Sequence, residues 1–340
     1  MVGELRADDH PRGSRFAGFP FRYAARMRIV STEAFEDTPE MQRVEEKIGK
    51  GDAWAAIECI FRYLRWKRKS STPKEWLIFA KHFSKAHFND FTNRCPITAR
   101  CRAKPRGYSG DAVVMDYIYG LESGVAGSQP DEVSTALLRH NTNMPAARAV
   151  RFRRERFARM MDDVCLQRSG NADILSVASG HFREVALSTK VAKGAFHTVT
   201  AFDQDAKSLA VIDRDYKACG ITAIQGKVSD LISEAVQFDQ DFDLILCGGL
   251  YDYLNDATAR KLTRSLFLKL KSGGKLQIAN FSPDLPDSGY MEGVMDWWLI
   301  YRTEEETVAC IEYVDRNLVE SYTTSYDPDR NICFLEVVRK

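Results

Sequence analysis

The second half of the chain alternates short apolar runs with longer amphipathic segments. The apolar runs contain many β-branched side chains, which is typical of buried parallel strands. The segments between them have apolar residues at the three- and four-residue spacing of helices. The pattern predicts strands at Asp173–Ala178, Thr198–Phe202, Ala223–Gln225, Phe242–Cys247 and Leu276–Phe281, and helices at Ala206–Tyr216, Ala257–Leu270 and Thr303–Arg316.

The chain closes with an expected antiparallel hairpin. Its strands are Val319–Tyr326 and Ile332–Val338, and the residues between them, Asp-Pro-Asp-Arg-Asn, favour a tight turn. Five parallel strands and two hairpin strands predict an α/β fold built on one Rossmann-like sheet of seven strands.

The first part of the chain has a helical pattern instead. We expect one helix from about Glu36 to Arg68 and a second after Pro73, with Thr72 as its cap. Between Asp131 and Gln167 the pattern fits one long helix or two shorter ones joined near Met144-Pro145. We therefore divide the chain into a basic, poorly ordered arm (1–30), a helical substrate or lid domain (31–150) and a Rossmann-like ligand-binding domain (151–340).

Bulk composition excludes several classes of protein. The 48 basic and 47 acidic residues nearly cancel, which predicts neither a nucleic-acid partner nor membrane insertion. The eight cysteines lack metal-ligand spacing, and several lie in apolar runs, which favours buried thiols in a reducing cytoplasm and no metal site. Five arginines between Arg148 and Arg156 could bind an anion, but their neighbouring acidic residues favour a solvated helix face.

The stretch from Asp173 to Val185, DILSVASGHFREV, reads as a strand, a tight turn and the start of a helix at Glu184. In doubly wound sheets, ligands bind at the carboxyl ends of the strands, and an acid at the end of the next strand holds a ribose. Here that acid is Asp203. The dinucleotide fingerprint is absent, because Ala178 and Phe182 stand beside the single Gly180. One close-approach glycine favours a nucleoside ligand without phosphates.

A loop before the sheet carries further candidates. Residues 105–111, Pro-Arg-Gly-Tyr-Ser-Gly-Asp, place Arg106 and Tyr108 between glycines, and Asp111 can cap the helix Ala112–Tyr119. We expect this loop to fold over the site as a lid, with Tyr108 and Asp111 closing on the ligand.

The segments VASGHF and FDLILCGGLYDYL, together with Asp203, resemble the class I S-adenosylmethionine-dependent methyltransferases. The resemblance covers about residues 150–340 and implies S-adenosyl-L-methionine as the cofactor. It implies that the first turn contacts the methionine part, that the acid holds the ribose, and that the loop after the fourth strand faces the transferred methyl group. The matching positions are Ser176, Ala178 and Gly180; Asp203 and Gln204; Val228 beside the adenine; and Cys247 to Tyr251, including Gly248 and Leu250.

A narrower resemblance adds the blocks PRGYSGDAVVMDYIYG, NMPAARAVRFRRER, KSGGKLQIANFSP and GYMEGVMDWWLIYR. They are similar to a bacterial subfamily grouped with the synthases of 3-hydroxypalmitate methyl ester, which methylate a carboxylate. The resemblance implies O-methylation of a small carboxylic acid, whose acceptor arrives already ionised and needs no base.

The chemistry of methyl transfer suggests roles for individual residues. Aromatic faces stabilise a sulfonium cation, and an arginine could position a carboxylate acceptor by a paired hydrogen bond. We expect catalytic roles for Tyr251, Asp296 and Tyr108, and substrate contacts from Arg106, Tyr253, Trp297, Tyr301 and Arg302, with Arg148 as a further arginine. His140 and His181 are the histidines near this region, and a structural role is the commoner one for either.

Three activities remain open from the sequence. The first is methylation of a small molecule at a carboxylate oxygen, with N-methylation of a small amine as a variant. The second is cyclisation of S-adenosylmethionine itself to azetidine-2-carboxylate, with release of methylthioadenosine. The third is a binding module without chemistry. The sequence does not decide between a monomer and a homodimer.

Overall fold

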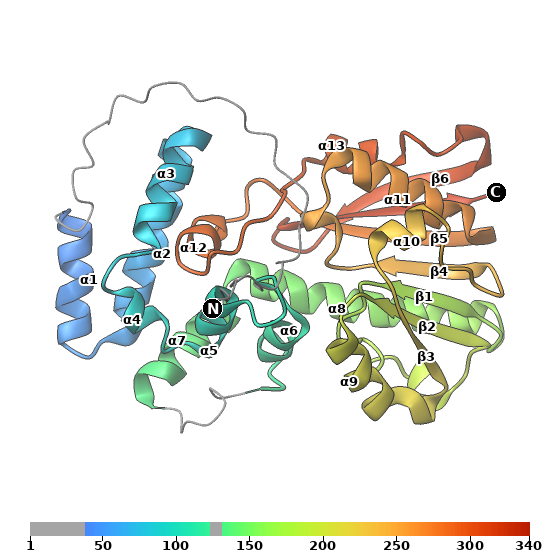
Figure 1. Ribbon diagram of the computed structural model, residues 1–340, viewed down its shortest axis with the longest axis horizontal. Coiled ribbons are helices and arrows are strands. Elements are labelled where there is room, and N and C mark those ends of the chain that lie inside the picture. The colour runs from blue at the N-terminus through green and yellow to red at the C-terminus, as the bar shows by residue number, and fades with distance from the viewer. Residues whose placement is uncertain (1–37, 123–130) are drawn as a thin grey trace, which may run out of the picture.

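The computed structural model describes residues 38–122 and 131–340. The chain has a sheet half and a helical half lying side by side (Figure 1). The arm expected at residues 1–30 lies outside the described residues.

A seven-stranded mixed sheet forms the sheet half, as expected. The parallel strands are β1 (Asp173–Val177), β2 (Thr198–Asp203), β3 (Ile221–Gln225), β4 (Phe242–Cys247) and β5 (Leu270–Phe281), and the hairpin strands are β6 (Val319–Tyr326) and β7 (Ile332–Arg339). Their order is β3-β2-β1-β4-β5-β7-β6, and β7 runs antiparallel to both neighbours. The order reverses between β1 and β4, which is where ligands bind in such sheets.

Alternate side chains of the strands enter two different cores. Ile174 and Leu244 pack in one core with helices α8 (Pro145–Gln167) and α9 (Ala206–Tyr216). Their neighbours Leu175 and Ile245 pack in the other, with α10 (Val228–Ile232) and α11 (Asp256–Leu268). The sheet is therefore the middle of three layers, as the nearly continuous apolar character of its central strands requires.

The helical half contains more breaks than the sequence pattern predicts. The single helix expected from Glu36 to Arg68 is wrong, because Gly51 adopts a positive φ of 74° and Asp52 caps a new helix. The expected cap at Thr72 is confirmed as a capping box. The helices of this half are α1 (Pro39–Gly49), α2 (Ala53–Ser70), α3 (Pro73–Phe83), α4 (Asn89–Thr92), α5 (Pro96–Ala103), α6 (Ala112–Ile118) and α7 (Glu132–Thr142), and α7 and α8 are separate helices.

Two expected helices in the sheet half differ in the structure, because one is replaced by turns and the other is shorter than expected. The segment after β1 does not become helical at Glu184, since Asp162 of α8 accepts the N–H groups of Thr189 and Lys190 and the hydroxyl of Ser188. The first helical residues there are η2 (Val191–Lys193). Likewise, 303–316 contains only α13 (Glu304–Val308) and η5 (Ala309–Ile311), followed by η6 (Arg316–Leu318).

The connection after β5 crosses into the helical half. Its helix α12 (Ser288–Gly293) lies beside α2 and α3 (Figure 1). Glu292 is buried there and accepts hydrogen bonds from Arg68 and from the indole N–H of Trp76. A Cβ atom on Gly289 would lie 2.7 Å from the carbonyl oxygen of Leu64, so only glycine allows this approach. Helix α8 also spans the boundary expected at residue 150, so two segments tie the halves together.

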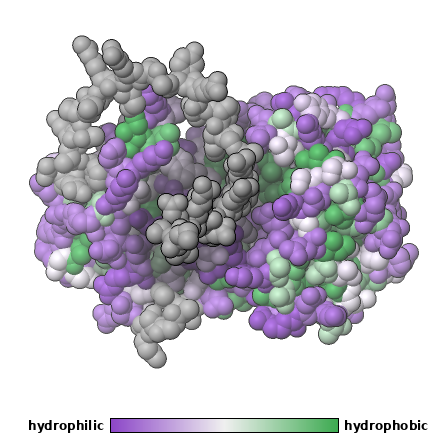
Figure 2. Space-filling view, viewed as in Figure 1, coloured by the Kyte–Doolittle hydropathy of each residue, from purple (hydrophilic) through white to green (hydrophobic). Residues whose placement is uncertain are grey.

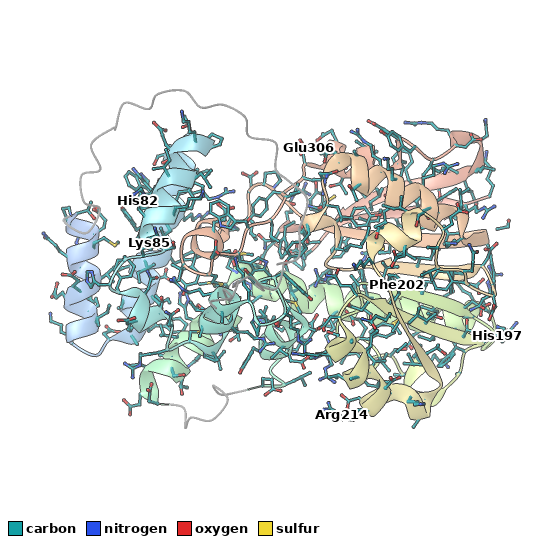
Figure 3. All side chains as sticks on the ribbon, viewed as in Figure 1. His82, Lys85, His197, Phe202, Arg214 and Glu306 are labelled. Carbon is teal, nitrogen blue, oxygen red and sulfur yellow. The ribbon has the colours of Figure 1, made fainter. Side chains whose placement is uncertain are left out.

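The carboxyl ends of the parallel strands point toward the helical half. In Figure 3, Phe202 near the end of β2 lies close to the middle of the molecule, whereas His197 before β2 lies at its far edge. Both halves present mostly hydrophilic residues in this view, with small hydrophobic groups over the sheet half (Figure 2). No helix in the described ranges is long and apolar enough to cross a membrane.

A charged cluster closes the opposite, amino-terminal end of the sheet. Asp173 and Asp243 stand at the starts of the adjacent strands β1 and β4, and both are buried. Lys271 Nζ lies 2.5 Å from Asp173 Oδ2 and 2.9 Å from Asp243 Oδ2, and Arg168 pairs with Asp243. Burial opposes ionisation of Asp173, but hydrogen bonds from Lys271, Thr198 and His197 outweigh it and lower its pKa.

We predict that Lys271→Met lowers the free energy of unfolding by about 1 to 3 kcal/mol, a range reduced from that of a fully buried pair because the lysine is partly exposed. Lys275→Met is the matched control, since Lys275 lies 3.7 Å from Glu336 on a more exposed site; its cost should stay below about 1 kcal/mol. Urea unfolding measures both.

The stabilising contribution of the ion pair between Lys271 and Asp173 has a defined pH dependence. Because the folded-state pKa of Asp173 is lowered, its stabilising contribution is present above the ordinary aspartate pKa of about 3.9 and is lost as the pH falls through the folded-state value. The difference between wild type and Lys271→Met should therefore shrink in acid. A difference that stays constant from neutral pH into this range would contradict the assignment.

Candidate functional site

A cavity of about 770 Å³ lies between the carboxyl ends of the strands and the helical half. Its floor comes from the ends of β1, β2 and β4, and its walls come from α6, α8 and residues 106–110. Trp297 and Leu299, on the connection after β5, complete it. This volume lies in the range of pockets that enclose a cofactor or a drug-sized ligand.

The turn after β1 keeps a backbone usually reserved for glycine. Ala178, Gly180 and Phe182 all have positive φ, at 52°, 57° and 49°. A non-glycine residue in this region costs about 1 to 3 kcal/mol, and such strain is concentrated at functional sites. The two positions where the sequence departs from a glycine-rich turn therefore retain the conformation that glycine would favour. A Cβ atom on Gly180 would lie 3.2 Å from the Ala112 Cβ, so helix α6 is packed directly on the turn.

Asp203 joins this turn to the end of β2. Its Oδ2 accepts the backbone N–H of Gly180 at 2.8 Å, and its Oδ1 accepts that of Asp205 at 2.8 Å. Burial raises the pKa of Asp203 above its usual value, against the opposing effect of these hydrogen bonds. The carboxylate lines the cavity, and acceptor capacity that the backbone N–H groups do not use can bind a ligand hydroxyl.

Residues 104–110, here called the strap, cross the cavity and are held at both ends. At one end Arg106 Nη1 contacts Asp205, Ser208 and His181 at 2.8, 2.7 and 3.3 Å. At the other end Lys104 pairs with the Asp296 carboxylate, and the Ser109 hydroxyl donates to the Asp296 carbonyl oxygen. The strap therefore links α9 and the first turn to the connection after β5.

Aromatic side chains gather where the strap meets that connection. The Trp297 indole N–H donates to the Tyr253 hydroxyl at 2.8 Å, and the rings of Tyr108 and Tyr253 meet edge to face. A Cβ atom on Gly110 would lie 2.3 Å from the Trp297 ring, so glycine is required for the strap to pass. Burial raises the pKa of both Tyr108 and Tyr253, which keeps these phenols neutral.

The arginine run on α8 corrects an expectation, because it is not a solvated face. Arg151 donates to the carbonyl oxygens of Ile118 and Thr142, and Arg154 stacks on Tyr119. Arg153 is only 7% exposed, lines the cavity and donates from Nη1 to the Gly248 carbonyl oxygen at 2.6 Å. Arg148 alone behaves as expected, in a surface pair with Asp329.

Several acidic groups also line the cavity. Asp116 accepts His181 Nδ1 at 2.8 Å and also binds Arg183, so His181 is a fixed buried side chain. Burial raises the pKa of Asp252 to about 6, although its Oδ1 accepts the backbone N–H of Phe281. Burial likewise raises the pKa of Glu184. His140, by contrast, pairs with Glu58 in the helical half and does not line the cavity.

The structure brings most of the expected site residues to one place. The residues of that set that line the cavity are Arg106, Tyr108, Ser176, Ala178, Gly180, Asp203, Gln204, Val228, Gly248, Leu250, Tyr253 and Trp297. Their individual roles stay predictions.

Five expected site residues lie outside the cavity, which corrects their placement. The ring of Tyr251 is fully buried in the core on the α11 side of the sheet, and its hydroxyl bonds Thr263. The Asp296 carboxylate accepts hydrogen bonds from Lys104 and from the indole N–H of Trp298. Asp111 caps α6 and is held by Arg100, Tyr301 stacks with Arg68, and Arg302 is buried against the carbonyl oxygens of Tyr251 and Leu254.

The charged residues of the cavity that sequence reasoning did not place in the site include Arg153 and Glu184. For Arg153 a signal was present, because it lies four residues after Ala149 and four before Phe157 on the apolar stripe of α8. Glu184 carries no such signal, since it follows a turn whose path depends on Asp162.

No family model matches the chain, and no curated protein matches it. A possible exported protein from Bordetella parapertussis has a TM-score of 0.53 at 17% identity, over 67% of this chain and 79% of that one. Magnesium protoporphyrin IX methyltransferase from Synechocystis PCC 6803, with bound SAH, has a TM-score of 0.45 at 12% identity, over 71% and 100%. A TehB-like SAM-dependent methyltransferase from Corynebacterium glutamicum gives 0.36 at 16%, over 50% and 81%. At 17% identity, the similarity to the exported protein shows a shared fold and nothing more.

Proposed function

We propose that this chain is an S-adenosylmethionine-dependent methyltransferase that methylates a small carboxylic acid. The observation that carries the proposal is Asp203, which stands at the end of β2, bonds Gly180 of the first turn and lines a cavity at the switch point of the sheet. An acid in this place is suited to the hydroxyls of a ribose. The methyltransferases among proteins of similar structure agree with this proposal.

The cavity meets the requirements of that cofactor. Val228 and Gly226 stand beyond β3, where the adenine would lie, and Asp203 stands one strand away. The strained turn at Ala178 lines the cavity, so a ligand can approach its backbone closely. Arg153 Nε is buried without a hydrogen-bond partner among the described residues, as expected where a ligand anion completes the site. When bound, the cofactor supplies an electrophilic methyl group on sulfur.

The aromatic residues would stabilise and enclose the reacting centre. Tyr108, Tyr253 and Trp297 present neutral faces, each of which stabilises a cation by about 0.5 to 2 kcal/mol. With the strap held across the cavity, they also keep water away from the reacting atoms. A carboxylate acceptor is already ionised, so no proton needs to be transferred. The reaction therefore does not require Tyr251 or Asp296, which lie outside the cavity.

Arg106 is the arginine placed to hold the acceptor. Of the three arginines proposed from the sequence, Arg302 is buried elsewhere and Arg148 lies on the surface, whereas Arg106 lines the cavity. Its contacts with Asp205, Ser208 and His181 all use Nη1. Nε and Nη2 therefore remain, within the described part of the chain, to bind a carboxylate through two hydrogen bonds.

We predict that Asp203→Ala weakens binding of S-adenosylhomocysteine by about 1 to 3 kcal/mol, because it removes a hydrogen-bond acceptor and leaves the N–H groups of Gly180 and Asp205 without their partner. Asp213→Ala, at an exposed position of α9, is the matched control and should leave the affinity unchanged. Calorimetry measures both. Equal affinities for Asp203→Ala and wild type would place the ribose elsewhere.

We expect the pure enzyme to convert S-adenosylmethionine to S-adenosylhomocysteine only when a suitable carboxylic acid is added. Liquid chromatography separates this product from methylthioadenosine. Methylthioadenosine formed without any acceptor would replace the proposal with self-cyclisation of the cofactor, and binding without either product would indicate a module without chemistry.

We further propose that the strap opens to admit ligands, because its contacts span the cavity. Trypsin should cut after Arg106 in the free protein, and S-adenosylhomocysteine should slow this cut by stabilising the closed strap. Cleavage after Arg330, which is exposed in the β6–β7 turn, serves as the internal control. An equal rate of cutting after Arg106 with and without the ligand would contradict a moving strap.

A further inference from the structure

Arg302 is a buried cation that fixes the short turn after β4. Its side chain is only 2% exposed. Its Nη1 donates to the Tyr251 carbonyl oxygen at 2.8 Å, and its Nη2 donates to the Leu254 carbonyl oxygen at 2.5 Å. These two acceptors precede and follow Tyr253, which lines the cavity. One planar guanidinium therefore holds both ends of the backbone segment that carries this ring.

The residues just before Arg302 contact the same turn, η4 (Tyr251–Tyr253). The backbone N–H of Ile300 donates to the Asp252 carbonyl oxygen at 2.7 Å, so residues 300–302 bind three carbonyl oxygens in and beside the turn. A 3₁₀ turn this short has few internal hydrogen bonds. Its conformation therefore depends on the donors that residues 300–302 supply.

The guanidinium of Arg302 is itself held from two directions. Asn280, a buried residue of β5, accepts Nη1 with its Oδ1 at 2.8 Å and donates from Nδ2 to the Ile300 carbonyl oxygen at 3.0 Å. Asp256, at the start of α11, accepts Nη2 at 2.9 Å, and its side chain is 68% exposed. The orientation of Arg302 is therefore set by the end of β5 and by a surface carboxylate.

The same connection also carries the second aromatic ring of this part of the cavity. Trp297 donates its indole N–H to the Tyr253 hydroxyl at 2.8 Å. Residues 297–302 thus supply one ring directly and fix the other through η4. A ring face attracts a cation only when the cation lies over it, within about 6 Å of its centre. A displaced Tyr253 ring would therefore weaken the binding of a cation more than that of a neutral ligand.

We propose that Arg302 is a positioning residue that sets the preference of the site for the sulfonium cofactor over its neutral thioether product. This inference rests on the proposed function. In methyl transfer the acceptor oxygen forms the new C–O bond, and the electron pair of the broken C–S bond stays on sulfur, which loses its charge. The attraction of the Tyr253 ring is thus present for S-adenosylmethionine and absent for S-adenosylhomocysteine. Arg302 acts through this ring and so favours replacement of the product by new cofactor.

The test is the ratio of the dissociation constant of S-adenosylhomocysteine to that of S-adenosylmethionine, measured by calorimetry without an acceptor. Tyr253→Leu should lower this ratio by about three- to thirtyfold, the factor for one cation–π contact. Arg302→Lys should lower it by about threefold or more, because one ammonium does not bind both carbonyl oxygens as the guanidinium does. The affinity of Arg302→Lys for S-adenosylhomocysteine should change by less than about twofold, since that ligand makes no cation–π contact.

Three further variants sharpen the result. The double variant Arg302→Lys, Tyr253→Leu should have the same ratio as Tyr253→Leu alone, because Arg302 acts through that ring. Arg260→Lys is the matched control, since Arg260 on α11 also binds a carboxylate and a carbonyl oxygen, and its ratio should equal that of wild type. Asp256→Ala removes the exposed partner of Arg302 and should lower the ratio in the same direction. The inference therefore remains testable even if Arg302→Lys does not fold.

The outcomes separate this inference from the proposed function. A wild-type ratio in both Arg302→Lys and Asp256→Ala, an equal loss of both ligands, or additive effects in the double variant would overturn the positioning role and leave the cofactor site at Asp203 intact. A wild-type ratio in Tyr253→Leu would show that this ring does not face the sulfonium and would overturn it too. Failure of wild type to bind either ligand would overturn the proposed function as well.

Discussion

The Asp203 carboxylate is the contact on which the geometry of the site depends. By accepting the N–H groups of Gly180 and Asp205, it fixes the turn after β1 against the end of β2. That turn holds Ala178 and Phe182 in a conformation which ordinary residues avoid, so it needs such an external anchor. The same carboxylate then presents its remaining lone pairs to the cavity. One side chain thus both shapes the site and offers it an acceptor.

The helical half completes the site by packing against helix α8 and the connection after β5. Helix α8 runs from this half into the sheet half, and α12 carries Glu292 back to Arg68 and Trp76. Trp297 stands on that returning connection, and the strap crosses to it through Asp296 and Gly110. The roof of the cavity is therefore positioned by the packing of helices far from it in the sequence, and changes in that packing would alter which acceptor fits.

The sequence predicted the parts of this arrangement that arise from local physics. The strands were recognised because buried parallel strands are short and apolar throughout, and Asp203 because it ends one of them. The caps at Thr72 and Asp111 follow from hydroxyl and carboxylate groups that accept the first N–H groups of a helix.

What could not be predicted depends on long-range contacts. The helix expected at Glu184 is absent because Asp162 accepts the N–H groups of Thr189 and Lys190, whereas the break at Gly51 and Asp52 is a local signal that was overlooked. Tyr251 and Tyr253 lie in one motif, but a single 3₁₀ turn directs the first ring into the core and leaves the second at the cavity. Arg302 and Tyr301 depend on how the connection after β5 folds back, which no local pattern shows. Arg153 lies on the apolar stripe of α8, and this position was overlooked because several other arginines surround it in the sequence.

The central claim is that a sulfonium nucleoside lies across the carboxyl ends of β3, β2, β1 and β4. A crystal structure of the protein grown with S-adenosylhomocysteine tests it most directly. The account predicts ribose hydroxyls within hydrogen-bond distance of Asp203 and the sulfur beneath Tyr108, Tyr253 and Trp297. Ligand density at any other place, or a cavity that stays empty at saturating ligand, would contradict it.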